Sequence, residues 1–566
     1  MKKIPNKYFR FIIVLSAISL FTFFYFLLYN SPIAGVDDAN IFFKFAHNLS
    51  SGLGFSFNPD GERVEGFTSF LWLLIITCLY KLPKEEIILI VFNTFLLSFS
   101  INYAVDFIDN HFTMDEKSGR ILSIESILFI SVCCFSPGFI LWSNLSLMES
   151  GLWASLLLII AILTLKIIYY SKYYLVFFSF LIFLIAITRP EGILICTFFG
   201  VLYLIITRKI NEFQKWKSII PLVVTLISII SLTIFRYFYF GYPLPNTYYA
   251  KVSYDMLYNL ENGIEYFLKF VYNNILIYLT IISIIFIFYK SVRIRTNPNK
   301  STRIQLIISF ISLCLFMVPI LEGGDHFDFQ RLYIVYLPIF LLNIFNSKNW
   351  NEYLTIKIKA NVIRKKYILL IILLPLLLLL QRHNFIEIMN NSKPMYIDFF
   401  YANEGRKIGT GLNSFFQFSG KYPSIGTIAI GGFGYTYKGN IIDLVGLENV
   451  EMAHFKRESR PKGIQGHSAF SKVVLFNQKP SLVLGNFTDS TSFMNFAKIP
   501  GNFSDNLLFE TKVLKNVFDD IEFRKLYAPV IIKHPYKNIY FETFIERDYA
   551  KQIEKCGYII HWKNPS

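Results

Sequence analysis

The sequence predicts a polytopic α-helical membrane protein of about eleven transmembrane helices, followed by a soluble α/β domain. Of its 566 residues, 54% are hydrophobic and only 17% are charged, and the mean hydropathy is +0.45. Ordinary soluble proteins are less apolar. Many apolar runs approach the length that a bilayer requires, and the composition changes after residue 380 to mixed charge with regular Gly and Pro. We therefore expect a transmembrane domain over residues 1–380 and an α/β domain over residues 381–566.

Charge and cysteine content exclude several other classes. Lys and Arg number 55 against 39 Asp and Glu, a net charge of +16, but the cations lie in short loops between apolar runs. Such loops determine membrane topology, and a nucleic-acid partner is not expected. The six cysteines form no CxxC and no Cys/His ligand spacing, which excludes a disulfide framework and a zinc site as organising features.

Twelve apolar runs are candidates for membrane helices. The first, Phe9–Tyr29, follows several cations and precedes no small-residue cleavage site, so we expect a retained helix with a cytoplasmic N-terminus. The others are Phe67–Tyr80, Ile87–Val105, Ile121–Trp142, Gly151–Ile168, Tyr174–Thr188, Gly192–Thr207, Ile219–Phe240, Tyr272–Tyr289, Ile304–Leu321, Leu332–Phe345 and Tyr367–Leu380.

Loop charge decides how many of these runs cross. If all twelve do, the basic loops near residues 208–217, 290–303 and 348–366 fall outside, against the positive-inside rule. One change moves all three to the cytoplasm: Phe67–Tyr80, which has Trp and Tyr and only 14 residues, lies in the interface. This gives eleven helices with the N-terminus inside and the C-terminal domain outside.

The C-terminal region of about 186 residues is long enough to bury a core. Short β-branched and apolar runs bounded by turn residues predict strands there. They are Thr427–Ile430, Ile441–Val445, Val473–Phe476 and Ser481–Leu484.

Two adjacent acids, Asp37 and Asp38, follow directly after the first helix, in the predicted outside loop at residues 30–66. A helix N-terminus explains them without any chemistry, because Asp suits the cap and the first turn. The functional alternative is a carboxylate held at the lipid boundary. Partial desolvation raises the basicity of such a group, so that it can take a proton from a hydroxyl.

The segment from Asp37-Asp38 through Gly61-Glu-Arg-Val-Glu-Gly-Phe-Thr68 resembles the first outside loop of GT-C glycosyltransferases. It looks especially like the branch that contains the terminal β-(1→2) arabinofuranosyltransferase. Further matching pieces run in order from about residue 30 to about residue 485. They are Met148-Glu149, Thr188-Arg-Pro-Glu-Gly192, Pro243-Leu-Pro-Asn-Thr-Tyr-Tyr-Ala-Lys251, Gly323-Gly-Asp325 followed by Arg331, Ile442-Asp-Leu-Val-Gly-Leu447 and Gly466-His467.

The resemblance implies transfer of a sugar from a polyprenyl-phosphate donor to an envelope glycan, lipid or protein, with inversion as the expected outcome. It places the chain in the cytoplasmic membrane of a bacterium, among membrane lipids, with its last domain outside. Asp37 or Asp38 would be the general base, with Asp37 preferred by its place in the motif. Arg189, Lys251 and Arg331 would bind the donor phosphate, although cations at helix ends also reach the interface without any such role.

The same resemblance suggests further binding residues. The substrate-binding candidates are Lys44, Asn58, Arg63, Glu65, Glu149, Glu191, Asn246, Tyr248, Asp325 and His326; the acceptor-binding candidates are Asp443 and His467. Phe55, Phe57, Tyr242, Tyr248 and Tyr249 are of the type that stacks on sugar rings, and membrane-interface aromatics have the same composition.

No cofactor and no metal site are assigned. A divalent cation bound by Asp325, His326 and the first-loop acids stays an open alternative. It is not assigned as a site, because these residues do not form a ligand set of defined spacing. A transporter or flippase, or a non-catalytic glycan-binding scaffold, is the alternative function. Transporters concentrate ionisable residues near the bilayer midplane, whereas these apolar runs contain almost none, which favours the enzyme.

Overall fold

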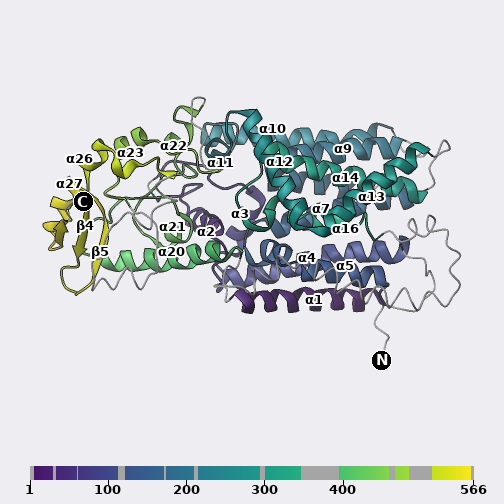
Figure 1. Cartoon of the computed structure of the whole chain (residues 1–566), viewed down its shortest axis with the longest axis horizontal. Helices are drawn as coiled ribbons and strands as arrows, with labels where there is room; N and C mark the ends of the chain where they lie inside the picture. The colour runs from purple at the N-terminus through teal and green to yellow at the C-terminus, as the bar shows by residue number, and fades with distance from the viewer. Residues whose placement is uncertain are drawn as a thin grey trace. The chain divides into compact units, whose positions relative to one another are not determined.

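The computed structural model of the chain (Figure 1) describes residues 6–29, 33–59, 61–112, 121–170, 174–208, 215–293, 300–345, 394–457, 466–483 and 513–562. Helices dominate the first two thirds of this part of the chain, and a six-stranded sheet lies in the last third. This agrees with a helical membrane protein that also contains a C-terminal α/β region.

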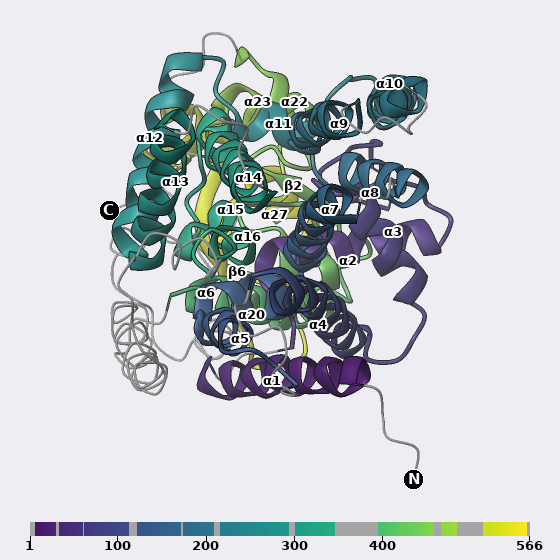
Figure 2. The ribbon, with the colours of Figure 1, turned by 90° about the vertical axis from the view of Figure 1, so that its right-hand side faces the viewer.

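Unit 1 is helical. Helix α8 packs against both α7 and α9, and α13 packs against α14 (Figures 1 and 2). Helices α4 and α10 lie mostly in this unit. The elements are α1 (Asn6–Tyr29), α4 (Glu85–His111), α5 (Ile124–Phe135), α6 (Pro137–Ile140), the π-helical turn η1 (Leu141–Leu145), α7 (Ser150–Tyr170), α8 (Leu175–Thr188), α9 (Gly192–Arg208), the 3-10 turn η2 (Lys215–Ile219), α10 (Ile220–Phe240), α12 (Met256–Asn273), α13 (Ile275–Arg293), α14 (Lys300–Glu322), the 3-10 turn η3 (Asp328–Gln330), α15 (Arg331–Ile334) and α16 (Leu337–Leu341).

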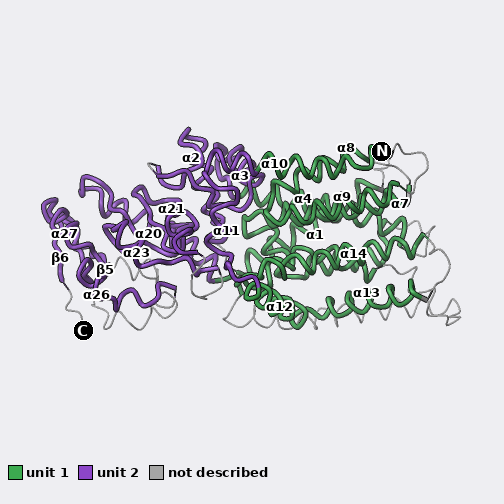
Figure 3. Tube along the Cα trace, turned by 90° about the horizontal axis from the view of Figure 1, so that it is seen from above, with its two compact units in different colours: residues 1–31, 87–232, 257–396 green, residues 32–86, 233–256, 397–566 purple. Residues whose placement is uncertain are grey.

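Contacts divide the chain into two compact units, coloured in Figure 3. Unit 1 comprises Met1–Ser31, Ile87–Leu232 and Leu257–Tyr396, and unit 2 comprises Pro32–Glu86, Thr233–Met256 and Ile397–Ser566. Unit 2 therefore combines the C-terminal region with the first predicted outside loop and with part of the loop that follows α10.

Six helices within the described ranges are long and apolar enough to cross a membrane, as expected for a multi-pass membrane protein. They are Lys7–Tyr29, Glu85–His111, Ser150–Ile168, Trp216–Phe240, Ile275–Val292 and Lys300–Glu322. The pair Ile124–Phe135 and Pro137–Leu145, bent by 73°, gives a seventh if it counts as one span. The higher number of eleven stays a prediction.

One predicted span is wrong. Residues 332–345 do not form a bilayer-length helix, since they divide into α15 and α16 around Tyr336. Leu332 to Leu342 are buried inside unit 1, and short apolar runs of this length are typical of protein cores. Their apolar character therefore reflects burial in protein. The last predicted span, Tyr367–Leu380, lies outside the described residues.

The run at Phe67–Tyr80 forms α3 (Phe70–Leu79), a helix of 10 residues. At 1.5 Å per residue it is about 15 Å long, half the thickness of a hydrocarbon core of about 30 Å. This length agrees with the expectation that the run does not cross. Its position in the interface stays a prediction. Helices α8 and α9, with 14 and 17 residues, are also shorter than a full span.

Unit 2 contains a mixed sheet of strand order β2-β1-β3-β5-β4-β6. Strand β1 is parallel to β2 and β3, and the remaining pairs are antiparallel. The elements are α2 (Asp37–Ser50), α3, α11 (Asn246–Lys251), α20 (Tyr396–Phe415), β1 (Ile425–Thr427), α21 (Gly431–Thr436), β2 (Ile441–Asp443), α22 (Val450–His454), α23 (Lys472–Gln478), β3 (Leu482–Val483), the 3-10 turn η5 (Val517–Asp519), α26 (Ile521–Leu526), β4 (Tyr527–Lys533), β5 (Tyr540–Glu546), α27 (Arg547–Glu554) and β6 (Ile559–Trp562).

The predicted strands at residues 441–445 and 481–484 coincide with β2 and β3, and the one at 427–430 overlaps β1 only at Thr427. The predicted strand at Val473–Phe476 is wrong, because these residues lie in helix α23. Val474 and Leu475 point into the apolar core of unit 2, beside Phe523 and Phe544. A run of four apolar residues fits a buried helix as well as a strand, and periodicity alone does not separate them.

Candidate active site

Asp37 and Asp38 are the first two residues of α2, which begins after the N-cap Val36. Two acids in a first turn interact favourably with the positive end of the helix dipole. The N-terminal role that the sequence suggested is therefore present in part, but neither acid is the capping residue. The two side chains have different surroundings.

The Asp37 carboxylate is buried and accepts two backbone hydrogen bonds. The N–H of Gly431 donates to Oδ2 at 3.1 Å, and that of Gly432 donates to Oδ1 at 2.8 Å. Burial raises the pKa of Asp37 to about 6, against the lowering effect of the Gly432 N–H; the charge of Asp38 raises it further. Both oxygens are thus used to fasten α2 to the start of α21.

This contact requires glycine. A Cβ atom on Gly431 would lie 1.9 Å from the backbone oxygen of Asp37, so only a residue without a side chain permits the approach. A second connection comes from Arg406 on α20, which donates to Asn40 of α2 at 2.6 Å and to Glu86 at 2.7 Å. The first loop is therefore held rigidly against the C-terminal region.

Asp38 lies beside a cation. Its Oδ2 is 3.6 Å from Nζ of Lys251, the last residue of α11. The side chains keep 22% and 29% of their surface exposed, respectively. The fold thus brings together one of the two predicted acids and one of the three predicted phosphate-binding cations, from segments more than 200 residues apart, and both remain accessible from solvent.

Two other predicted site residues hold this pair in place. The Asn246 side chain, at the start of α11, donates to the carbonyls of Gly446 and Leu447, both at 2.8 Å. Its backbone N–H donates to the carbonyl of Glu65 at 3.0 Å. The Glu65 carboxylate in turn receives hydrogen bonds of 2.8, 2.8 and 3.1 Å from Arg236. Asn246 and Glu65 are framework residues in this geometry.

The loop after β2 is organised by Asp443, one of the two acceptor-binding candidates. Its buried carboxylate accepts from the N–H groups of Glu448 at 2.9 Å and Val445 at 2.8 Å. Burial raises the pKa of Asp443 to about 6, and these N–H groups oppose the increase. Asp443 therefore shapes the loop that carries Glu448. Glu448 was not among the candidates predicted from the sequence.

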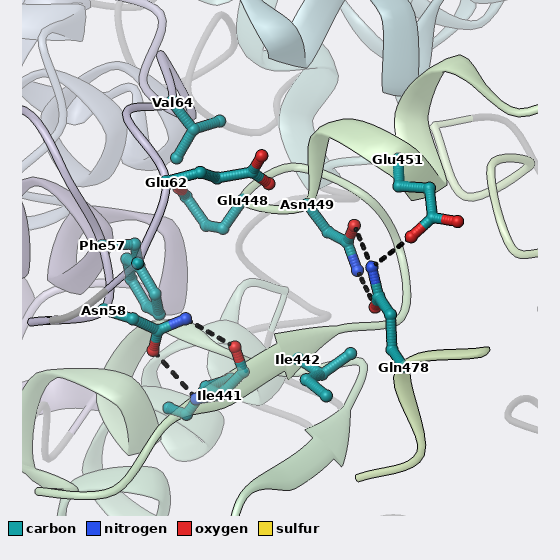
Figure 4. Close-up of a pocket in the computed structure, with 11 residues that line it drawn as sticks. Phe57, Asn58, Glu62, Val64, Ile441, Ile442, Glu448, Asn449, Glu451 and Gln478 are labelled. Carbon is teal, nitrogen blue, oxygen red and sulfur yellow. Dashed lines mark hydrogen bonds between the residues drawn. The ribbon is translucent and has the colours of Figure 1, made fainter. Parts of the chain in front are cut away.

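A pocket of about 300 Å³ opens beside this loop (Figure 4). Its lining includes Glu62 and Phe57 from the first loop, and Glu448, Asn449 and Gln478 from the C-terminal region. The side chain of Asn58, a predicted substrate-binding residue, also lines it. Asn58 exchanges two hydrogen bonds of 2.8 Å with the backbone of Ile441, on β2.

The remaining polar candidates of unit 2 have separate environments. Lys44 is buried on α2 with Nζ 3.5 Å from the carbonyl of Tyr437, and burial lowers its pKa to about 8. The exposed Arg63 places its guanidinium 4.8 Å from the ring centroid of Tyr239. His467 is half-buried in the loop before α23.

The predicted sugar-stacking aromatics contact protein groups. Tyr242 and Tyr249 pack on His454, with ring centroids 4.0 and 4.2 Å apart. Arg457 lies over Tyr248 at 4.9 Å. Phe55 packs in an aromatic cluster with neighbours that include Tyr239, and Phe57 is buried at the pocket wall. Of these aromatics, only Phe57 lines the pocket.

Unit 1 contains the other predicted cations, and each is paired with an acid. Arg189 donates to Glu149 at 2.6 Å and also to Glu191. Arg331 donates to Asp325 at 2.9 Å. The two carboxylates at Arg189 offset its charge, so a phosphate there would compete with bound acids.

Arg331 is also packed between aromatic rings. Its guanidinium lies 4.0 Å from the Phe327 centroid and 5.2 Å from that of Trp142. His326 stacks on the same Phe327 ring at 4.2 Å. Within the described ranges, no group of three or more His, Cys, Asp or Glu side chains is placed to hold a metal ion. The cation alternative for Asp325 and His326 therefore gains no support.

No protein-family model and no curated protein matches this sequence, so the resemblance to GT-C enzymes rests on the motifs themselves.

Proposed function

We propose that the chain is a membrane glycosyltransferase that uses a lipid-phosphate sugar donor, with Asp38 as the general base. The observation that carries the proposal is the pairing of Asp38 with Lys251. In the sequence, Asp38 follows shortly after the membrane-length helix α1. A base must be reachable by the acceptor, and Asp38 keeps part of its surface. Asp37, which the motif favoured, has both oxygens engaged by backbone N–H groups.

The proposed reaction uses the two charges of this pair in different ways. The acceptor hydroxyl oxygen attacks the anomeric carbon, its proton passes to the Asp38 carboxylate, and the bond to the phosphate oxygen breaks. The electron pair leaves with the polyprenyl phosphate. The Lys251 ammonium stabilises the carboxylate before transfer and the developing phosphate charge during it. A single displacement of this kind inverts the anomeric configuration.

The test is a transfer assay on the purified full chain in liposomes, with a panel of radiolabelled polyprenyl-phosphate sugars and an envelope extract as acceptor. Removal of a general base lowers rates by about 10²–10⁴-fold, and we expect a loss of this size in Asp38→Asn with the same thermal midpoint. Glu265→Gln, at an exposed acid of α12 in unit 1, is the matched control and should leave transfer unchanged.

Asp37→Asn should behave differently. Its amide nitrogen cannot accept an N–H, so one buried hydrogen bond is lost, at a cost of about 1–3 kcal/mol in the free energy of unfolding. Its thermal midpoint should therefore fall. Full transfer activity in Asp38→Asn would reject the assignment and leave the transport and scaffold alternatives.

A further inference from the structure

The side chain of Glu448 is buried, and no hydrogen bond among the described residues explains its burial. The residue is 6% exposed, and neither of its carboxylate oxygens has a hydrogen-bond partner within the described part of the chain. Burial raises its pKa well above the ordinary value, and the charges of Asp443, Asp38 and Glu62 raise it further. A buried polar group without a partner destabilises a fold, so a role in ligand binding is the simplest reason for its presence.

The backbone makes room for this carboxyl group. A Cβ atom on Gly66 would lie 2.0 Å from Cδ of Glu448. Glu448 forms part of the wall of the 300 Å³ pocket, and Figure 4 places it next to Glu62. Glu448 therefore combines a place in the pocket wall with carboxylate oxygens that no group within the described residues satisfies.

The rest of the pocket is preorganised. Gln478 donates to Glu451 at 2.8 Å and to Asn449 at 3.1 Å, and Asn449 donates back to Gln478 at 2.8 Å. Glu62 accepts from the N–H of Val450 at 3.1 Å. These contacts fix the polar rim without using the oxygens of Glu448, and they leave a site rich in hydrogen-bond acceptors.

The lining selects a class of ligand. Three carboxylates, Glu62, Glu448 and Glu451, repel an anion and accept hydrogen bonds from hydroxyl groups. Phe57 and Val64 supply apolar wall, against which the C–H face of a sugar ring can pack. A volume of about 300 Å³ is at the lower end of the range for small-molecule sites, which fits one or two rings.

We propose that this pocket, the Glu448 pocket, binds an uncharged saccharide ring whose hydroxyl groups donate hydrogen bonds to Glu448 and Glu62. Asn246 lies on α11 with Lys251 and is hydrogen-bonded to Gly446 and Leu447, the residues directly before Glu448, so the pocket loop is attached to the helix that carries Lys251. The assignment of this ring to the acceptor glycan rests on the proposed function. The proposal that the pocket binds a saccharide does not depend on it.

The test measures binding of methyl glycosides of neutral hexoses and pentoses, and of the corresponding disaccharides, to the purified full chain by saturation-transfer NMR and calorimetry. We expect at least one neutral glycoside to bind, and Glu448→Gln to weaken its binding about tenfold, as loss of a buried hydrogen bond does. The same variant should not lower the thermal midpoint, because neither oxygen of Glu448 has a hydrogen-bond partner to lose within the described residues. Glu554→Gln, an exposed position on α27, should change neither quantity.

A second measurement needs no variant. Carbodiimide modification of Glu448, followed by mass spectrometry, should slow when the glycoside is bound. The proposal is overturned if no neutral glycoside binds or protects, if glucuronic acid or inorganic phosphate binds more tightly than the neutral sugars, or if Glu448→Gln binds like the unmodified protein.

The outcomes separate the two proposals. Asp38→Asn should lose transfer and keep glycoside binding. If Asp38→Asn keeps transfer while Glu448→Gln loses binding, the proposed function fails and the saccharide site stands. If Glu448→Gln keeps binding while Asp38→Asn loses transfer, the site fails and the proposed function stands.

Discussion

The ion pair between Glu65 and Arg236 gives the sharpest stability prediction. Both side chains are buried, with 2% and 5% of their surfaces exposed, and three N–H···O contacts join them. Removal of one partner from such a pair leaves an uncompensated charge, at a cost of about 3–5 kcal/mol. Glu65→Gln retains one acceptor oxygen, so we expect the lower value of about 3 kcal/mol, a factor of about 100 in the unfolding equilibrium.

The assay is proteolysis of the purified chain in detergent, with the cleavage sites in unit 2 followed by mass spectrometry across a temperature series. The matched control is the exposed pair Glu265–Lys269, which has a similar distance of 2.7 Å but exposed fractions of 65% and 62%. Because solvent screens this pair, Glu265→Gln should leave the cleavage temperature unchanged.

A double-variant cycle completes the test. Glu65→Gln combined with Arg236→Gln should be less destabilised than the sum of the two single variants, because the double variant leaves no unpaired charge. A cleavage temperature for Glu65→Gln equal to that of the unmodified chain would refute the reasoning. Additive effects of the two substitutions would refute the direct coupling of the pair.

Three further predictions concern backbone contacts and pH. Gly431→Ala should lower the thermal midpoint of unit 2, since its Cβ would meet the Asp37 oxygen at 1.9 Å; an unchanged midpoint would contradict this contact. Gly263→Ala should do the same for unit 1 by separating α12 from α14, because its Cβ would lie 2.1 Å from the Ile320 oxygen, and crosslinking of engineered cysteines on the two helices should weaken. The pKa of Asp443 rises from 3.8 to about 6 on folding, so the folded state binds its proton more tightly and loses about 3 kcal/mol of stability as pH rises from about 4 to 6. The fall of the thermal midpoint over that range should be shallower in Asp443→Asn, and equal slopes would exclude the effect.

The sequence was most informative where one physical effect dominated. Long apolar runs such as Phe9–Tyr29 became helices, since chain length and hydropathy together leave few alternatives. The wrong predictions concern apolar runs that are buried in protein, because such runs have the same composition as a membrane span or a buried strand. Leu332–Phe345 is as apolar as a membrane span but is buried inside unit 1, and in Val473–Phe476 only Val474 and Leu475 are buried, on one side of α23.

The candidate site was predictable in part. The motif placed Asp38 and Lys251 in the same proposed centre, and the fold brings them to 3.6 Å. It did not distinguish Asp38 from Asp37, because the difference arises from the N–H groups of Gly431 and Gly432, almost 400 residues along the chain. Glu448 follows directly after the Ile442–Leu447 motif, and an acid at that position was the available signal.

Unit 2 is assembled from three stretches of chain that the ribosome makes far apart in time. Residues 32–86 are synthesised early, but the N–H groups that donate hydrogen bonds to the Asp37 carboxylate belong to Gly431 and Gly432, which are synthesised much later. Until then this acid has no partner from the C-terminal region, and α2 lacks its principal packing surface. A translation product that stops before residue 431 should therefore insert its early membrane helices yet leave the first loop unfinished and open to proteases.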